Sequence, residues 1–490
     1  MNKTKFIVCA GVMLAAATAA HAGGILTNTN QSVDFLRNPA RDAAIGLDGV
    51  YSNPAGVAFM PEGFHLAFNW QYAHQTRTTT WDNKLLELGV KNNGSSIKKY
   101  EGVANAPIIP SLQAAYNKGD WSFQFNFSVP GGGGKCEFDQ GIGSFETVVG
   151  AIADALPGVT GYDVDGYMKG NQYYFGVQAG AAHKFNEHLS VYGGLRLLYG
   201  TASYEARLNN IKVRMGETET TLPIYFDAAI QQAIKAGMDA GLTMDQAMEL
   251  PAVQTLSGVA AKLSPYAEKG MNLKSDQTGW GIAPIIGIDY KAGPFNFAAK
   301  YEFKTRMRMK NNSDLTEAGV IDAMNKYVNG TSVPEDAPAL LAVGAQWSII
   351  DNVRLNLGYH HFYDTDAHWY NNSQKLLDGG TNEYLGGVEW DITPRLTVSG
   401  GGQLTRYQLT DDYMNDISFV VNSYSLGLGL SYKVTDAVKL SAAYFQTNYE
   451  NYDMNTPEQK MESLGLTVPA GKTSFTRTNR VLGIGCEITL

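Results

Sequence analysis

The chain has 490 residues, among them 53 glycines, 27 tyrosines and 20 phenylalanines, and only 17% of its residues are charged. Its formal net charge of -9 argues against nucleic-acid partners. No stretch beyond the N-terminus approaches the ~18 uninterrupted apolar residues that a membrane helix needs. A secreted chain of this composition is therefore either soluble or a membrane β-barrel, and the many aromatic and turn residues favour the barrel.

The first residues are typical of a secretory signal peptide. Lys3 and Lys5 form a basic start, residues 6–20 are mostly apolar, and Ala20-His21-Ala22 supplies the small residues of a cleavage site. We therefore expect residues 1–22 to be removed, which makes the net charge of the mature chain still more negative because this segment contains no acidic residue.

The segment from residue 23 to residue 62 does not resemble barrel strands, because its apolar residues do not recur with a period of two. It contains Asn53-Pro54-Ala55-Gly56, which is a turn signal. A segment ahead of a barrel is either a disordered tail or a plug in the lumen. The apolar residues between positions 45 and 60 favour an ordered plug.

From residue 64 onward, stretches of alternating apolar and small or polar residues are separated by turn signals. In the final stretch Leu482, Ile484 and Cys486 share one face, whereas Gly483 and Gly485 share the other. This alternation predicts a lipid face and a lumen face, and the number of stretches, about fourteen, suits a bacterial barrel. The predicted strands are residues 64–80, 107–118, 120–130, 171–185, 188–205, 277–292, 294–309, 337–350, 352–366, 382–393, 395–410, 418–434, 437–450 and 476–490.

The connections between these strands alternate in length. Short turns such as residues 117–120 and 292–294 use Gly, Pro, Asn and Asp, whereas long loops lie near residues 131–170 and 206–276. Such alternation is typical of an outer-membrane barrel with both termini on the periplasmic side. Of the three cysteines, Cys136 and Cys486 remain after the signal is removed, and we expect both to be unpaired thiols.

The longest loop, residues 206–276, contains helical periodicity. Phe226, Ile230 and Ile234 recur at a spacing of four, and a second segment rich in alanine and methionine follows, with Met244 and Met248. The two helical segments either pack on each other and cap the barrel mouth, or form a groove in which methionines adapt to apolar ligands.

The predicted strand 294–309 offers a candidate chemical site. Its odd positions are mostly apolar, so its even positions are expected to face the lumen as a basic stripe that could bind a carboxylate head group. Alternatively, these cations pair with acids of the plug or of neighbouring strands. The candidate head-group cations are Lys300, Lys304, Arg306 and Arg308, together with Arg196 on another strand.

Residues 29–75 resemble the N-terminal hatch and first strand of the FadL family of outer-membrane long-chain fatty acid and hydrocarbon transporters. The most specific match is Asn53-Pro54-Ala55, which is similar to a motif of that family's hatch. The resemblance implies a fourteen-stranded barrel that binds apolar ligands in an outer groove, passes them to a lumen pocket and releases them sideways at a kinked third strand. Pro130, Gly131 and Gly132 are similar in place and type to that kink.

The sequence thus predicts an all-β protein: a transmembrane antiparallel barrel over residues 63–490, an N-terminal hatch over residues 23–62, and helical insertions in extracellular loops. The predicted function is passive uptake of fatty acids or hydrocarbons across the outer membrane of a Gram-negative bacterium; the alternative is a general diffusion porin for polar solutes. We expect a monomer that contacts outer-membrane lipid and the barrel assembly machinery. We expect no enzymatic activity, because no nucleophile motif is present. We expect no cofactor, and no metal site at His360 and His361, because adjacent residues of a strand point to opposite faces.

Overall fold

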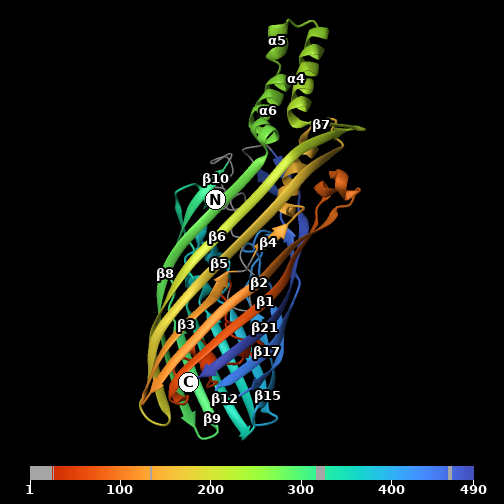
Figure 1. Ribbon diagram of the computed structural model, residues 1–490. Coiled ribbons are helices and arrows are strands. Elements are labelled where there is room, and N and C mark those ends of the chain that lie inside the picture. The colour runs from red at the N-terminus through yellow and green to blue at the C-terminus, as the bar shows by residue number, and fades with distance from the viewer. Residues whose placement is uncertain (1–24, 26, 133–134, 316–325, 462–465) are drawn as a thin grey trace.

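The computed structural model describes residues 25, 27–132, 135–315, 326–461 and 466–490. Within these ranges the chain forms one long barrel from which helices project at one end (Figure 1). The predicted signal peptide lies outside the described residues. No helix in the described part of the chain is long and apolar enough to cross a membrane.

Fourteen antiparallel strands form the wall, and each predicted strand corresponds to one of them. The first strand pairs with the last, so the sheet has no open edge and no row of unpaired backbone groups to expose to lipid. The wall strands are β1 (Gly63–Asp82), β2 (Ile97–Lys118), β3 (Trp121–Gly132), β5 (Gly161–Lys184), β6 (Leu189–Met215), β8 (Met271–Ala292), β9 (Phe295–Glu302), β12 (Leu340–Ile350), β13 (Val353–Phe362), β14 (Asn382–Asp391), β15 (Leu396–Arg406), β16 (Ser423–Lys433), β17 (Val438–Tyr449) and β21 (Gly471–Thr489).

Most of the shorter elements lie at the long-loop end of the wall, and three of them precede β1. The short strands are β4 (Lys135–Phe138), β7 (Thr218–Thr221), β10 (Arg308–Leu315), β11 (Ser332–Pro334), β18 (Tyr452–Thr456), β19 (Gln459–Met461) and β20 (Leu466–Val468). The helices are α2 (Val33–Arg37), α3 (Gly143–Ala155), α4 (Leu222–Asp239), α5 (Met244–Met248) and α6 (Pro251–Lys269), and 3₁₀ turns are η2 (Leu47–Val50), η3 (Gly56–Phe59), η4 (Lys84–Leu88), η5 (Val90–Asn92), η7 (Asp364–Asp366) and η8 (Tyr370–Leu376). Helix α3 lies in a stretch that the sequence predicted to be only a loop.

The outward face of the wall is an apolar band bounded by aromatic side chains. On β8, exposed side chains run from Tyr290 through Ile288, Ile286 and Ile282 to Trp280. At ~3.3 Å per residue and a tilt of ~40°, the stretch from Tyr290 to Trp280 spans roughly 25 Å along the barrel axis, the height of a membrane barrel's apolar band. At the long-loop end, β1, β2, β3, β5, β6, β8 and β21 extend beyond the predicted ends, because polar residues there leave no apolar alternation to detect. Most of the remaining wall strands stop short of the predicted ends.

The predicted strand 294–309 is not continuous, and this reverses part of its alternation. Strand β9 ends at Glu302, which pairs with Ile285, whereas β10 pairs Lys310 with Thr278. Residues 303–309 therefore lie opposite residues 279–284 with one residue to spare, which is a bulge. The carbonyl oxygen of Pro284 accepts a hydrogen bond from the amide of Phe303. Pro284 has no N–H, so it cannot donate the second hydrogen bond of a regular pair. Beyond the bulge the odd positions face inward and the even positions face outward.

The N-terminal part of the described chain, residues 27–62, lies inside the barrel, and we refer to it as the hatch segment. It contacts strands from opposite sides of the wall, since α2 packs on β15, β16, β17, β21 and β1 while η3 packs on β3, β5, β6 and β8. Ile25 belongs to an apolar cluster with Trp81 and Tyr100 in the long-loop half. Leu490 pairs with Phe64 at the short-turn end. The two described ends of the chain therefore lie at different heights, because the hatch segment runs down through the lumen to reach β1.

Closure of the barrel can be tested with a native thiol. Phe68 on β1 lies directly opposite Cys486 on β21, and both face outward. In the Phe68→Cys variant the two β-carbons are expected to lie ~4.5–5.5 Å apart, so mild oxidation should form a disulfide between the first and last strands. The measurement is the number of free thiols after denaturation together with the non-reducing gel mobility.

The matched control is Leu66→Cys, which lies opposite Ile488 rather than Cys486. It should keep all its thiols free under the same oxidation. Equal crosslinking in both variants, or crosslinking in neither, would contradict the register at which the barrel closes.

Candidate functional site

The hatch segment is fixed to the wall by buried ion pairs. Arg37 and Arg41 each reach Oε1 of Glu389 on β14 at 2.9 Å, and Glu389 is only 5% exposed. Arg41 also pairs with Asp48 at 2.7 Å, and Arg37 pairs with Asp34. Burial raises the pKa of the Asp34 carboxyl, but the charges of Arg37, Lys439 and Arg41 together outweigh this effect, and the pKa lies well below its usual range. One wall carboxylate therefore anchors two arginines of the hatch segment.

A buried histidine makes a second connection between the hatch segment and the wall. Nε2 of His360 on β13 lies 2.8 Å from Oδ1 of Asp42, and Nδ1 lies 2.8 Å from Oε2 of Glu383 on β14. Glu383 also accepts hydrogen bonds from Gln403 and Thr405 on β15. His360 thus joins an acid of the hatch segment to a polar network on the inner wall.

The Asn53-Pro54-Ala55 motif docks on the opposite side of the lumen. The side-chain amide of Asn53 donates to Asp289 on β8 at 2.6 Å, and Asn296 on β9 donates to the same carboxylate at 2.9 Å. The carbonyl oxygens of Pro54 and Ala55 accept hydrogen bonds from Gln124 on β3 and Ser190 on β6, both at 2.7 Å. The motif therefore bonds to three different wall strands, as a seated plug requires.

Two of the predicted head-group cations, Arg196 and Lys300, do face the lumen, but both are already engaged by one shared carboxylate. Each pairs with Glu302, and Lys300 lies 2.7 Å from it. The Lys300 ammonium also donates to the carbonyl oxygen of Tyr51, and both cations lie over the Tyr51 ring. Both residues therefore follow the alternative stated from the sequence, in which these cations pair with acids of neighbouring strands or contact the plug.

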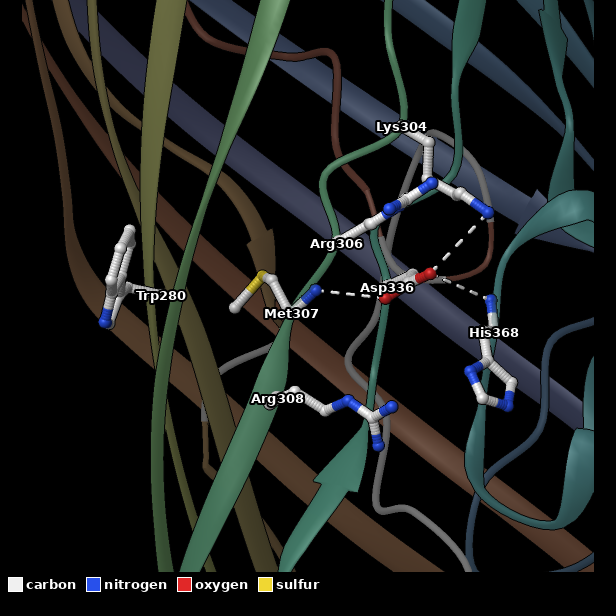
Figure 2. A pocket seen from close by; sticks show the side chains of 7 residues that line it. All are labelled: Trp280, Lys304, Arg306, Met307, Arg308, Asp336 and His368. Carbon is white, nitrogen blue, oxygen red and sulfur yellow. Dashed lines mark hydrogen bonds and ion pairs between the residues drawn. The ribbon is translucent and has the colours of Figure 1, made fainter.

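The prediction that Arg306 and Arg308 line the lumen is wrong. The bulge between β9 and β10 turns them to the outward face, where both are exposed, and places Met307 and Met309 inside. Lys304, at the bulge itself, is half-buried and lies 3.7 Å from Asp336. Figure 2 shows the three cations around a pocket beside Asp336 and His368. The predicted basic stripe is therefore split between the two faces of the wall.

The third strand is irregular where the sequence predicted a kink. The pairing of β3 with β5 shifts register between Ser128 and Gly131, and Gly132 has a φ of 91°, which favours glycine. The hatch segment bonds directly to this irregularity, because the amide of Asn28 donates to the carbonyl oxygen of Pro130 at 2.9 Å. Gln31 also accepts from the amide of Val129 at 3.1 Å. Gly133 and Gly134 lie outside the described residues.

The loop helices α4, α5 and α6 form a projection above the barrel (Figure 1). Ile234 is buried and Ile230 half-buried in a cluster that holds the helices together. Phe226 is buried in another cluster, which includes residues of α3, β5 and β6 and so joins α4 to the barrel. Met244 and Met248 are 48% and 40% exposed. Of the five residues predicted to form an apolar groove, only the two methionines are exposed.

Two arginines that the sequence analysis missed form the strongest candidate site in the lumen. Arg77 on β1 and Arg477 on β21 lie directly opposite each other and are 2% and 3% exposed. Neither has an ion-pair partner among the described residues, and Nε of each arginine lacks a hydrogen-bond acceptor. Arg477 lies over the ring of Tyr449 and donates to the carbonyl oxygen of Phe419 at 3.2 Å.

Apolar side chains surround this arginine pair. Cys136 and Phe138 belong to a large buried cluster on one side, and Phe419 and Phe475 belong to a second cluster on the other. Two adjacent guanidinium groups repel each other strongly where water is scarce, so an anionic group between them would be stabilised. The arrangement suits a ligand with an acidic head and an apolar body. No cluster of three or more His, Cys, Asp or Glu among the described residues could hold a metal ion.

Comparisons with solved structures identify the same fold. A Pseudomonas aeruginosa FadL homologue matches with a TM-score of 0.63 and 13% identity, covering 95% of this chain and 100% of that chain. The Ralstonia pickettii toluene transporter TbuX matches at 0.53 and 12%, covering 94% and 98%, and the P. putida toluene transporter TodX matches at 0.51 and 13%, covering 91% and 94%. The sequence matches no family model and no curated protein. Identities this low establish the fold alone.

The anchoring role of Glu389 gives a direct test of how the hatch segment is held. Glu389→Gln leaves two buried arginines without their shared carboxylate, which should destabilise the seated hatch segment by about 3–5 kcal/mol. Hydrogen exchange of residues 27–62 in the purified barrel should therefore become faster. Lys99→Gln removes an exposed ion pair with Glu101 and should change nothing measurable. Unchanged exchange in the Glu389 variant would contradict the anchoring role.

Proposed function

We propose that this protein is an outer-membrane transporter for the passive uptake of hydrophobic small molecules. The observation that carries the proposal is a lumen filled by a bonded hatch segment and containing a buried arginine pair without an acid partner. A filled lumen disfavours free passage of ions, and unpaired buried cations favour an amphipathic ligand. The fold shared with proteins titled as a FadL homologue and as toluene transporters supports the same class of cargo.

The route begins at the projection of loop helices. Met244 and Met248 offer flexible apolar side chains outside the membrane, as a first contact for varied hydrophobic ligands requires. From there the ligand enters the apolar cluster in the long-loop half of the lumen, and an acidic head group lies between Arg77 and Arg477. Neutral hydrocarbons use the apolar cluster alone.

The exit is lateral, through the irregularity in β3. Asn28 and Gln31 bond to backbone groups of Pro130 and Val129, so a displacement of the hatch segment would release this part of the wall. The register shift between Ser128 and Gly131 interrupts the ladder at this place. In this orientation the short turns and the C-terminus face the periplasm.

Planar-bilayer conductance combined with native mass spectrometry tests the proposal. A transporter with a seated hatch segment should conduct almost no ions, and the extracted protein should retain a hydrophobic small molecule that organic extraction identifies. The competing function is a diffusion porin for polar solutes. Steady ion conductance from an empty protein would establish the porin instead.

The arginine pair makes a more specific prediction. The double variant Arg77→Gln/Arg477→Gln should bind a long-chain fatty acid at least about tenfold more weakly, because charge-assisted hydrogen bonds are lost. Binding of a neutral alkane of similar length should stay the same. Fluorescence displacement titration of the two ligands measures the difference.

Arg480→Gln is the matched control, since Arg480 lies on the same strand but on the outward face. It should leave both affinities unchanged. An equal loss of fatty acid and alkane binding in the double variant would show that the arginines stabilise the lumen rather than recognise a head group.

A further inference from the structure

An unneutralised cationic cluster lies on the outside of the barrel, at the bulge between β9 and β10. Arg306, Arg308 and Lys310 are all exposed and face outward on consecutive even positions. Two of them border a pocket of about 600 Å³ (Figure 2). The pocket is lined by Trp280, Lys304, Arg306, Met307, Arg308, Asp336 and His368.

The charge of this cluster is not balanced within the described part of the chain. Arg306, Arg308 and Lys310 have no ion-pair partner there. The one acid lining the pocket, Asp336, is buried and accepts from the amides of Met307 at 3.0 Å and His368 at 3.2 Å, with Lys304 at 3.7 Å. The carboxylate of Asp336 is thus already bonded to two amides and lies near Lys304. It does not neutralise the exposed arginines.

The acids on the neighbouring outward face lie farther toward the loops. Asp276 is opposite Asn312, and Asp314 is opposite Lys274. Both therefore lie beyond Lys310, away from the apolar band. Asp366 is also exposed, and its carbonyl oxygen accepts from Lys304, but the exposed cations Arg306, Arg308 and Lys310 outnumber this acid. The region between Trp280 and Lys310 therefore remains positive.

The height of the cluster relative to the apolar band identifies its surroundings. Trp280 on β8 is an exposed aromatic side chain at the upper edge of the band, and Phe303, just after β9, is a second one that lies opposite Pro284, four residues below Trp280 on β8. Such aromatic belts lie at the level of lipid head groups. Arg306 follows Phe303 by three residues, and Arg308 borders the same pocket as Trp280. The guanidinium groups therefore lie where the charged groups of the outer leaflet would be.

We infer that this cluster binds the phosphate groups of a phosphorylated glycolipid of the outer leaflet. Arginine offers a planar pair of donors that matches a phosphate, and basic pockets at this level of a membrane protein bind anionic head groups. The acyl chains of the same lipid would lie on the apolar face of β8 below Trp280. The inference rests on the outer-membrane location in the proposed function.

Native mass spectrometry of the detergent-solubilised protein, titrated with diphosphorylated lipid A, tests this inference. The wild-type protein should retain lipid A, and Arg306→Gln/Arg308→Gln should bind it at least about tenfold more weakly. Lipid A from which both phosphates have been removed should bind the two proteins equally weakly. Arg306→Lys/Arg308→Lys keeps the charge but loses the planar donors, and it should give an intermediate affinity.

The control variant is Arg480→Gln, which removes a single exposed outward-facing arginine on β21 with no ion-pair partner among the described residues. It should bind lipid A like the wild type. Heat-modifiable gel mobility verifies that every variant is folded. Equal binding of dephosphorylated lipid A by the wild type, or an equal loss in the Arg480 variant, would overturn the inference.

The fate of the lumen ligand separates this inference from the proposed function. The Arg306/Arg308 variant should retain the same hydrophobic small molecule as the wild type, because both arginines lie outside the lumen. A parallel loss of fatty acid binding and lipid A binding in this variant would instead make the cluster a ligand-capture site and overturn the lipid assignment. An empty lumen with intact lipid A binding would contradict the proposed transport function but not the lipid A site.

Discussion

The hatch segment and the barrel wall neutralise each other's buried charges. Glu389 on β14 holds Arg37 and Arg41, and His360 on β13 joins Asp42 to Glu383. Removing a charge from water costs several kcal/mol of free energy per ion unless an oppositely charged partner offsets that cost. Without the hatch segment, Glu389 would keep only Arg354 as an ion-pair partner among the described residues, and without the wall, Arg37 and Arg41 would keep only Asp34 and Asp48. Each part thus adds to the stability of the other.

Against that background, the arginines divide into two groups. Arg196 forms an ion pair with Glu302 inside the protein, and so contributes to the stability of the structure. Arg77 and Arg477 inside the lumen, like Arg306 and Arg308 outside it, have no acid partner among the described residues. Proteins rarely leave adjacent cations unneutralised, so these positions indicate where other molecules supply the negative charge.

The barrel could be predicted from the sequence because a period of two is a local signal, repeated in every wall strand. The failure at β9 has an equally local cause, since one extra residue reversed the faces of Arg306 and Arg308. The Arg77 and Arg477 pair could not be found in this way. Alternation places each of them inward, but only the pairing of the first strand with the last brings them together.

The pairing of β1 with β21 also sets the order in which the molecule can form. It joins residues such as His65 and Thr489, which are 424 positions apart. Contacts between such distant residues form slowly, because a long loop must close first. The hatch segment directly precedes β1, so it must be enclosed as this last seam forms rather than threaded in later. Until then the edges of β1 and β21 remain unpaired, and unpaired strand edges are prone to aggregation.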